Sequence, residues 1–199
     1  MLKLGLTGNI ASGKSTVGKL FQRLGAYYFD ADEIIKSLYR KDQELYAKVL
    51  KHFGSTILDE RGEIDRRILA NLVFSDIAKL KTLEELTHAA LYEYLSAQFL
   101  KIPKNAIAIV EATLLIEKGT YRHYDAIILV YSKFEDCLKR GIMRGMTPED
   151  FFRRWRHQLS PDIKTRFAHF IIKNNSSERE LLRRAEEVFN TFKLWNMIK

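Results

Sequence analysis

The sequence predicts a three-layer α/β fold, with helices on both faces of a parallel five-stranded sheet. Three observations lead to this prediction. Short apolar runs rich in β-branched residues alternate with segments whose apolar residues recur at helical spacing, a pattern typical of parallel sheets. The chain has 199 residues, enough for one compact domain with insertions. Two longer helical segments interrupt the alternation, and we expect them to be insertions at an edge of the sheet.

Five apolar runs are predicted to form the buried strands. They span residues 2–7, 27–30, 106–111, 126–131 and 170–173. Residues 14–24 and 177–193 are predicted to be amphipathic helices, and Ser176 or Ser177 is placed to cap the second.

Two segments lie outside this alternation. Residues 65–101 follow a helical pattern without a strand, and residues 140–167 are helical and rich in arginine. We therefore expect residues 1–199 to form a single domain that carries a helical insertion at 62–102 and a basic helical lid at 140–167.

The chain carries 33 lysines and arginines against 25 aspartates and glutamates, a net charge of +8. This excess favours anionic partners such as nucleic acid, anionic membranes or small polyphosphates, and the alternative is a charge that serves solubility alone. No apolar run approaches the roughly 20 residues that span a bilayer, and the first residues lack the pattern of a signal peptide. The single cysteine, Cys137, cannot form an internal disulfide. We expect a cytoplasmic protein that does not bind membranes.

The strongest functional signal is the sequence GNIASGKS at residues 8–15, which matches G-x-x-x-x-G-K-[ST]. An apolar run leads into it and a helical pattern leads out of it, which disfavours a chance match. The glycines let successive backbone N–H groups point at one anion, and the following helix adds the positive end of its dipole. We expect Lys14 to reach the β- and γ-phosphates and the Ser15 hydroxyl to bind Mg²⁺. The sequence therefore predicts a P-loop NTPase fold.

Acidic residues follow two of the predicted strands. A helix of about 11 residues runs roughly 16 Å from the loop, and a strand of about four residues returns roughly 13 Å. Because the crossover is right-handed, we expect Asp30 and Asp32 near the phosphates, as a general base or a partner of Mg²⁺. The alternative for either is a cap for the helix near Glu33. Glu111 ends the third strand, where it could hold the metal or be a surface glutamate.

The basic lid can be interpreted in three ways. It could close over ATP and neutralise charge on the transferred group, it could bind the phosphate backbone of nucleic acid, or it could be a solvated helix face. Arg140 and Arg144 are four residues apart, so both can face one ligand. The solvated face suits three other arginines better, namely Arg153, Arg154 and Arg156.

Together these motifs resemble the dephospho-CoA kinase family, and the resemblance covers nearly the whole chain. It is carried by GLTGNIASGKST at 5–16, DAD at 30–32, GEIDR at 62–66 and LLIE at 114–117, with further matches at His88, Arg140, Arg144, Gln158, Asn174 and Asn175. Six positions depart from the family's usual residues: Asn9 and Ala11 replace glycine, Ala89 and Thr113 replace proline, and Glu111 and His169 replace aspartate. These departures leave the phosphate site intact and concern the acceptor pocket and the metal site.

The resemblance implies ATP-dependent phosphorylation of the ribose 3′-hydroxyl of dephospho-CoA, which gives coenzyme A and ADP. Its implied catalytic residues are Asp32 as the general base, with Lys14, Arg140 and Arg144 around the transferred group. The residues expected to bind ATP are Gly8, Ala11, Ser12, Gly13, Lys14, Ser15, Thr16, Arg140 and Asn175. Those expected to bind the acceptor are Thr7, Asp32, Arg66, His88 and Leu114. The metal is expected at Ser15, with Glu111 as a further candidate ligand.

Two alternatives stay open. A nucleoside or nucleotide kinase would share the loop and the lid but take another acceptor. A nucleotide-dependent switch or RNA-binding module is a different class: a GTPase should carry Asn-Lys-x-Asp, which the sequence lacks, and an RNA binder should show salt-dependent affinity. We expect ATP and dephospho-CoA as partners, no nucleic acid, and a monomer or weak homo-oligomer.

Overall fold

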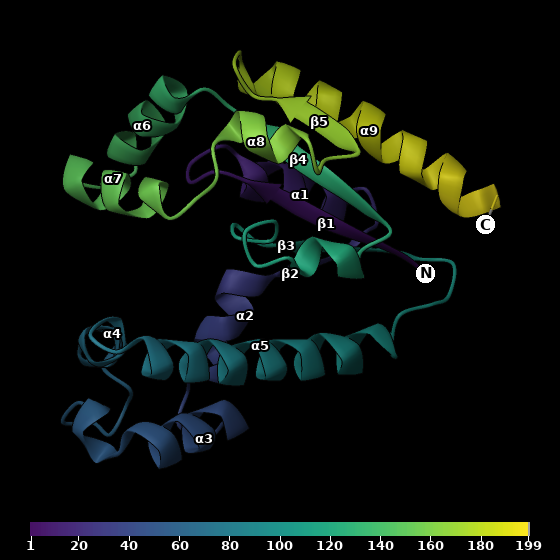
Figure 1. Cartoon of the computed structure of the whole chain (residues 1–199). Coiled ribbons are helices and arrows are strands. Elements are labelled where there is room, and N and C mark those ends of the chain that lie inside the picture. Colours follow the sequence, from purple (N-terminus) through teal and green to yellow (C-terminus); the bar gives the residue numbers. More distant parts are fainter. Residues whose placement is uncertain (199) are drawn as a thin grey trace. The chain divides into compact units, whose positions relative to one another are not determined.

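The computed structural model describes residues 1–198, and its elements are labelled in Figure 1. The chain divides into two compact units. The first, which we call the sheet unit, comprises residues 1–30 and the residues from 102 onward. The second, the helical unit, comprises residues 31–101. Within residues 1–198, none of the helices combines the length and the apolar character needed to cross a bilayer.

A parallel five-stranded sheet organises the sheet unit, in the order β2-β3-β1-β4-β5. Its strands are β1 (Leu2–Gly8), β2 (Tyr27–Asp30), β3 (Ile107–Glu111), β4 (Ala126–Tyr131) and β5 (Phe170–Lys173). All five coincide with the predicted runs to within one residue at each end. The predicted α/β fold class is therefore confirmed.

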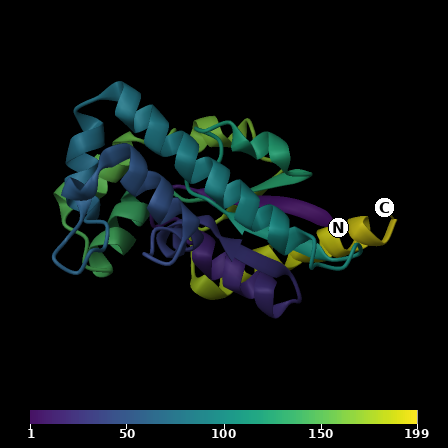
Figure 2. The same ribbon diagram turned by 90° about the horizontal axis from the view of Figure 1, so that it is seen from below.

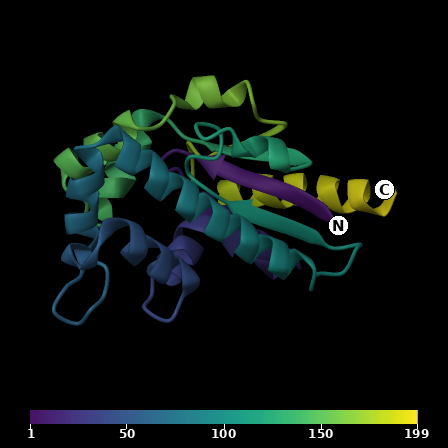
Figure 3. The ribbon, with the colours of Figure 1, turned by 60° about the horizontal axis from the view of Figure 1, so that its bottom comes forward.

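Two long helices pack on one core with the sheet: α1 (Lys14–Arg23) and α9 (Glu178–Ile198). The rings of Phe21 and Phe189 stack between them with their centroids 5.1 Å apart. Figure 3 shows α9 behind β1, and α9 contacts α1, β3 and β5. The predicted cap of α9 is Ser177, whose hydroxyl accepts a hydrogen bond from the backbone N–H of Glu180 at 3.3 Å.

The carboxyl ends of the strands converge on one edge of the sheet. The parallel register places Glu111 beside Leu6 of β1 on one side and beside Asp30 of β2 on the other, and it places Gly8 beside Val130 of β4. The loop that follows β1 therefore begins beside the acidic ends of β2 and β3. This is the edge at which open α/β sheets bind their ligands.

The basic segment folds as three helices rather than one: α6 (Phe134–Met143), α7 (Pro148–Arg156) and α8 (Pro161–Thr165). Thr147 and Ser160 cap α7 and α8 with side-chain oxygens, and a proline opens each helix. Arg144 stands at the C-cap of α6, one turn after Arg140, and Gly145 follows with a φ of 87°. A short turn, η2 (Thr120–His123), precedes β4.

The helical unit has a core of its own. It contains α2 (Ala31–Leu38), α3 (Glu44–Phe53), η1 (Ser55–Ile57), α4 (Arg66–Phe74) and α5 (Ile77–Phe99). Figure 2 shows α3 alongside the longer α5. Buried side chains from these helices, including Leu45, Val49, Leu69 and Val73, form one cluster. The unit starts at residue 31, earlier than the predicted insertion at 62–102, because α2 and α3 contact α5 and share this core.

Candidate active site

The loop between β1 and α1 has the backbone that its motif predicts. Gly13 precedes α1 with a φ of 103°, and a Cβ there would lie 2.5 Å from the Asn174 side-chain nitrogen. A Cβ on Gly8 would lie 2.5 Å from the Val130 carbonyl oxygen. Any larger residue would clash at both positions, so the two glycines of the motif are required by the packing as well as by the turn.

Ala11 is the non-glycine residue with a positive φ in the described chain, at 57°. The left-handed conformation brings Cβ close to the following carbonyl oxygen and costs about 1–2 kcal/mol for residues other than glycine. The sequence marked this position as one where the resembling family has glycine, and the structure gives the physical reason for that preference. Ala11 thus adopts the conformation at an energetic cost.

Lys14 and Ser15 open α1 at the edge of the sheet. Lys14 is 7% exposed, and its Nζ donates a hydrogen bond to the Asn9 carbonyl oxygen at 3.2 Å. The Ser15 hydroxyl donates to Glu111 Oε1 at 2.9 Å. The predicted phosphate-binding lysine and the predicted metal-binding hydroxyl therefore lie together, next to the acidic end of β3.

Glu111 is a buried carboxylate with partners on both oxygens. Its Oε2 accepts a hydrogen bond from the Tyr28 hydroxyl at 2.6 Å, while Oε1 accepts from Ser15. Burial raises the pKa of Glu111, and the bonds from Tyr28 and Ser15 and the charge of Lys14 act in the opposite direction. Sequence reasoning missed Tyr28. The available signal was its spacing of two from Asp30, which puts both side chains on one face of β2.

The oxygen groups at this edge fit a magnesium ion. Mg²⁺ prefers oxygen ligands and is usually bound by one or two carboxylates together with substrate phosphates. Ser15 Oγ and Glu111 supply such oxygens, and the charge of Asp30 is close enough to affect the pKa of Glu111. Within residues 1–198 there is no cluster of three or more histidine, cysteine, aspartate or glutamate side chains that could hold a metal alone.

Arg140 contacts the chain around β4 and β5. Its guanidinium donates to Ser132 Oγ and to the Asn174 carbonyl oxygen, each at 2.8 Å. Asn174 in turn donates from Nδ2 to the Ser12 carbonyl oxygen in the phosphate loop at 2.7 Å. The side chain of Asn175, a predicted ATP ligand, accepts from the backbone N–H of Lys133 at 3.2 Å. Asn174 thus connects the predicted arginine to the phosphate loop, a role that the sequence did not indicate.

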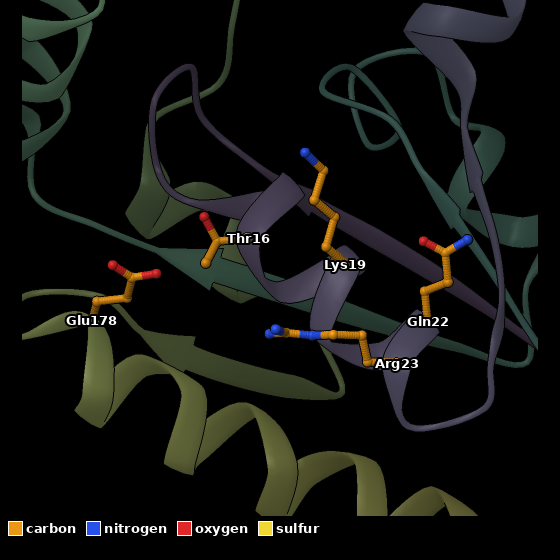
Figure 4. Close-up of a pocket in the computed structure, with 5 residues that line it drawn as sticks. All are labelled: Thr16, Lys19, Gln22, Arg23 and Glu178. Carbon is orange, nitrogen blue, oxygen red and sulfur yellow. The ribbon is translucent and has the colours of Figure 1, made fainter.

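A hollow of about 480 Å³ adjoins the loop and is lined by Thr16, Lys19, Gln22, Arg23 and Glu178. Figure 4 shows the Arg23 guanidinium and the Glu178 carboxylate extending into the space between α1 and α9. Thr16, a predicted ATP ligand, lies at its edge near the loop.

Two predicted acceptor ligands belong to the sheet unit. Thr7 is fully buried, and its hydroxyl donates to the carbonyl oxygens of Ala112 at 2.9 Å and Thr113 at 3.3 Å. Leu114 follows in the same turn and is half-buried. Thr113 contributes its backbone carbonyl, which a proline would also provide. Its replacement of proline therefore leaves this contact available.

Three other predicted residues belong to the helical unit. Asp32 lies in the first turn of α2. The Arg66 guanidinium lies 5.8 Å from the centroid of the Tyr39 ring, and the Tyr39 hydroxyl is 2.8 Å from Thr87 Oγ1. His88 is the next residue on α5 and is exposed. Arg66 and the α5 turn that contains His88 thus contact the same tyrosine.

Comparison with known proteins gives a consistent result. The family model for dephospho-CoA kinase matches residues 2–180. The dephospho-CoA kinase of Aquifex aeolicus is 47% identical over 189 residues, covering 95% of this chain and 96% of that protein. The one from Syntrophus aciditrophicus is 36% identical, covering 90% and 78%.

Solved structures agree. Dephospho-CoA kinase from Campylobacter jejuni superposes with a TM-score of 0.71 at 28% identity, covering 98% of each chain. The protein TT1252 from Thermus thermophilus gives 0.84 at 29% identity, covering 96% and 97%. Shikimate kinase from Acinetobacter baumannii, at 17% identity and a TM-score of 0.55, covers 100% of this chain and 96% of its own, and it shares the fold.

Proposed function

The chain belongs to the dephospho-CoA kinase family, and from this membership we propose how its own residues carry out the reaction. The protein is a kinase that uses ATP to phosphorylate dephospho-CoA, the last step of coenzyme A biosynthesis. We take the accepting group to be the ribose 3′-hydroxyl. The observation that carries the proposed chemistry is the contact between Ser15 in the phosphate loop and Glu111 at the end of β3.

ATP binds with its β- and γ-phosphates on the loop from Gly8 to Thr16. Gly13 and the start of α1 supply fixed positive dipoles, and Lys14 supplies a full charge beside them. Ser15 and Glu111 would hold Mg²⁺, which would neutralise charge on the phosphates. Arg140 and Arg144, one turn apart at the end of α6, stabilise the transferred group. The helices α6 to α8 act as the lid.

Asp32 is the general base. It follows Asp30 by two residues, and Asp30 is paired in register with Glu111 at the edge where β1 leads into the phosphate loop. The Asp32 carboxylate orients the 3′-hydroxyl and takes its proton as the oxygen attacks the γ-phosphorus. The oxygen–phosphorus bond to ADP breaks as the new one forms, and the electrons of the broken bond leave with ADP.

Four predicted acceptor ligands besides Asp32 are proposed to contact dephospho-CoA. Arg66 and His88 of the helical unit are proposed to contact the anionic and polar groups of dephospho-CoA, because Arg66 already lies over Tyr39 next to the turn that carries His88. Thr7 shapes the acceptor end of the sheet through the turn after β3, and Leu114 in that turn offers an apolar contact.

A coupled assay for ADP release tests the function. We expect turnover with dephospho-CoA and ATP, and little turnover when adenosine or AMP replaces the acceptor. Preferred turnover of adenosine or AMP would instead support a nucleoside or nucleotide kinase. Steeply salt-dependent binding of oligonucleotides without kinase activity would support an RNA-binding module.

The role of Asp32 has a separate test. We predict that Asp32→Asn lowers kcat by about 10²- to 10⁴-fold, the usual contribution of a general base, while the Kd for ATP changes little. Glu33→Gln is the matched control, because Glu33 lies next to Asp32 in α2 and pairs with exposed Lys36. Steady-state kinetics and calorimetric ATP titration measure both effects. Full turnover by Asp32→Asn would remove Asp32 from the mechanism.

A further inference from the structure

The first half of the phosphate loop is bonded to the connection between α7 and α8. The backbone N–H of Ile10 donates to Gln158 Oε1 at 2.9 Å. Asn9 Nδ2 donates to the Leu159 carbonyl oxygen at 3.0 Å, and Asn9 is 2% exposed. These bonds join residues almost 150 positions apart in the sequence. Asn9 supplies its bond through a side chain that glycine, the family's usual residue here, does not have.

The connection is itself anchored by a buried ion pair. The backbone N–H of Leu159 donates to Glu117 Oε1 at 2.8 Å. The Lys164 ammonium lies 2.9 Å from the same oxygen and also donates to the Thr113 carbonyl oxygen at 3.0 Å. The Lys164 side chain is 0% exposed and that of Glu117 is 12% exposed. We call Gln158, Glu117 and Lys164 the loop clamp.

A buried ion pair needs a reason other than stability. Removing two charges from water costs about as much as their attraction returns, so an apolar pair of similar size would often be equally stable. Burial lowers the pKa of Lys164, while the partner Glu117 acts in the opposite direction. What the pair provides is a fixed position, because one carboxylate oxygen accepts both the Lys164 ammonium and the Leu159 N–H.

The residue after the bonded pair is Ala11, whose left-handed backbone is unfavourable for alanine. A strained conformation persists only when the surrounding structure fixes it. Gln158 and Asn9 fix the two residues before Ala11, and Asn174 fixes the Ser12 carbonyl after it. The strained residue is therefore bracketed by hydrogen bonds on both sides.

We propose that Gln158, Glu117 and Lys164 are positioning residues, which hold Asn9 and Ile10 so that the Ala11 turn keeps its phosphate-binding form. Without the clamp, Ala11 relaxes out of the left-handed region and the amides after it no longer point at one anion. The inference rests on the proposed function only in that the loop binds ATP. It does not depend on the identity of the acceptor.

The test measures ATP binding without acceptor. We expect Gln158→Ala to weaken the calorimetric affinity for ATP about fivefold, the usual effect of one lost hydrogen bond, in protein that circular dichroism shows to be folded. The same substitution in an Ala11→Gly background should weaken it less, since glycine adopts the left-handed form without cost. A purely structural role would lower the melting temperature without this coupling between positions 158 and 11.

Variants of the ion pair complete the test. Lys164→Met alone leaves Glu117 buried without its ion-pair partner and is strongly destabilising, so two other variants are informative. Lys164→Arg should keep ATP affinity within about twofold. The neutral double variant, Lys164→Met with Glu117→Gln, should weaken ATP affinity about fivefold. Lys104→Met, at an exposed lysine of the same unit, is the control for charge loss.

The outcomes separate cleanly. Unchanged ATP affinity in folded Gln158→Ala, or an equal loss with alanine and with glycine at position 11, would overturn the clamp. If the wild-type protein bound no ATP, both the proposed function and the proposed role of the clamp in ATP binding would be wrong. If the protein bound ATP but did not phosphorylate dephospho-CoA, the proposed function would be wrong, while the effect of the clamp on ATP binding would still be tested by the variants.

Discussion

At the scale of single residues, Ala11 adopts a backbone conformation that shapes the phosphate loop but lowers the stability of the fold. Its φ of 57° is unfavourable for alanine, and the bonds to Asn9, Ile10 and Ser12 hold it there. We predict that Ala11→Gly raises the free energy of unfolding by about 1 kcal/mol, because relief of the left-handed strain outweighs the extra unfolded-state entropy of glycine. Thermal unfolding should show a melting temperature about 2–4 °C higher. A lower melting temperature would mean that the alanine methyl group contributes packing that exceeds the strain.

The sequence predicted part of this site and not the rest. The motif located Gly8, Gly13, Lys14 and Ser15, because a loop that binds phosphate needs those residue types at fixed spacing. The motif could not locate Tyr28 or the contact of Asn174 with the phosphate loop, since each joins residues more than 80 positions apart, and only the family resemblance pointed to Asn174. Such contacts depend on strand order, which no local pattern specifies. The roles of Asp32, Arg66 and His88 stay predictions.

At the scale of elements, the β4–β5 edge explains one departure from the family pattern. The backbone N–H of His169 donates to the Ile127 carbonyl oxygen at 2.9 Å, and His169 Nδ1 accepts from the Ile127 N–H at 3.1 Å. The His169 side chain thus adds a hydrogen bond to β4 just before the pairing of β4 with β5 begins at Ile128 and Phe170. An aspartate carboxylate, the residue that the resembling family usually has, can accept the same hydrogen bond.

We therefore predict that His169→Asp keeps stability within about 1 kcal/mol, whereas His169→Ala lowers it by about 1–3 kcal/mol, because a buried N–H of β4 loses its partner. Chemical denaturation of the two variants beside the wild type measures the difference. Equal losses for both substitutions would show that ring packing, rather than the accepted hydrogen bond, is what His169 contributes.

Helix α9 carries a pH-dependent contact in its first turns. Hydrogen bonds and charge from Arg183, with Arg184, lower the pKa of Glu180 from 4.5 to about 2. Because the folded-state pKa lies below the unfolded one, the stabilisation is present above about pH 4.5 and is lost as the pH falls toward about 2. We predict that Glu180→Gln melts below the wild type near neutral pH and that the difference closes on acidification. The contact is exposed, so the difference should also shrink in high salt, and one that stayed constant with pH would exclude this cause.

Element boundaries show where sequence patterns are reliable. The five strands were predicted because buried parallel strands read as short apolar runs. The basic segment was predicted as one helical stretch, although Thr147-Pro148 and Ser160-Pro161 are caps followed by proline that mark two new helices. The start of the helical unit at residue 31 could not be predicted from local sequence, because α2 belongs to it through packing on α5 and α3.

At the scale of the whole molecule, the net charge of +8 should matter for substrate encounter. Both substrates are polyanions, so a cationic protein attracts them over distances that salt screens. We predict that kcat/KM for dephospho-CoA falls about tenfold between about 0.05 M and about 0.5 M NaCl, while kcat changes much less. Initial rates across the salt series measure this, and sucrose at matched viscosity controls for diffusion. A salt-independent kcat/KM would show that encounter is not steered by charge.

The central place of β1 has a consequence for how the protein is made. The ribosome produces β1 and its phosphate loop before the other strands of the sheet, yet both hydrogen-bonding neighbours of β1 are strands that begin at Ile107 and Ala126. The newly made β1 therefore has no strand to pair with until more than half of the chain has been synthesised. Its apolar side chains stay exposed to solvent during that time. Nucleotide present in the cell can assist folding only late in synthesis, after the strand that begins at Ala126 has joined.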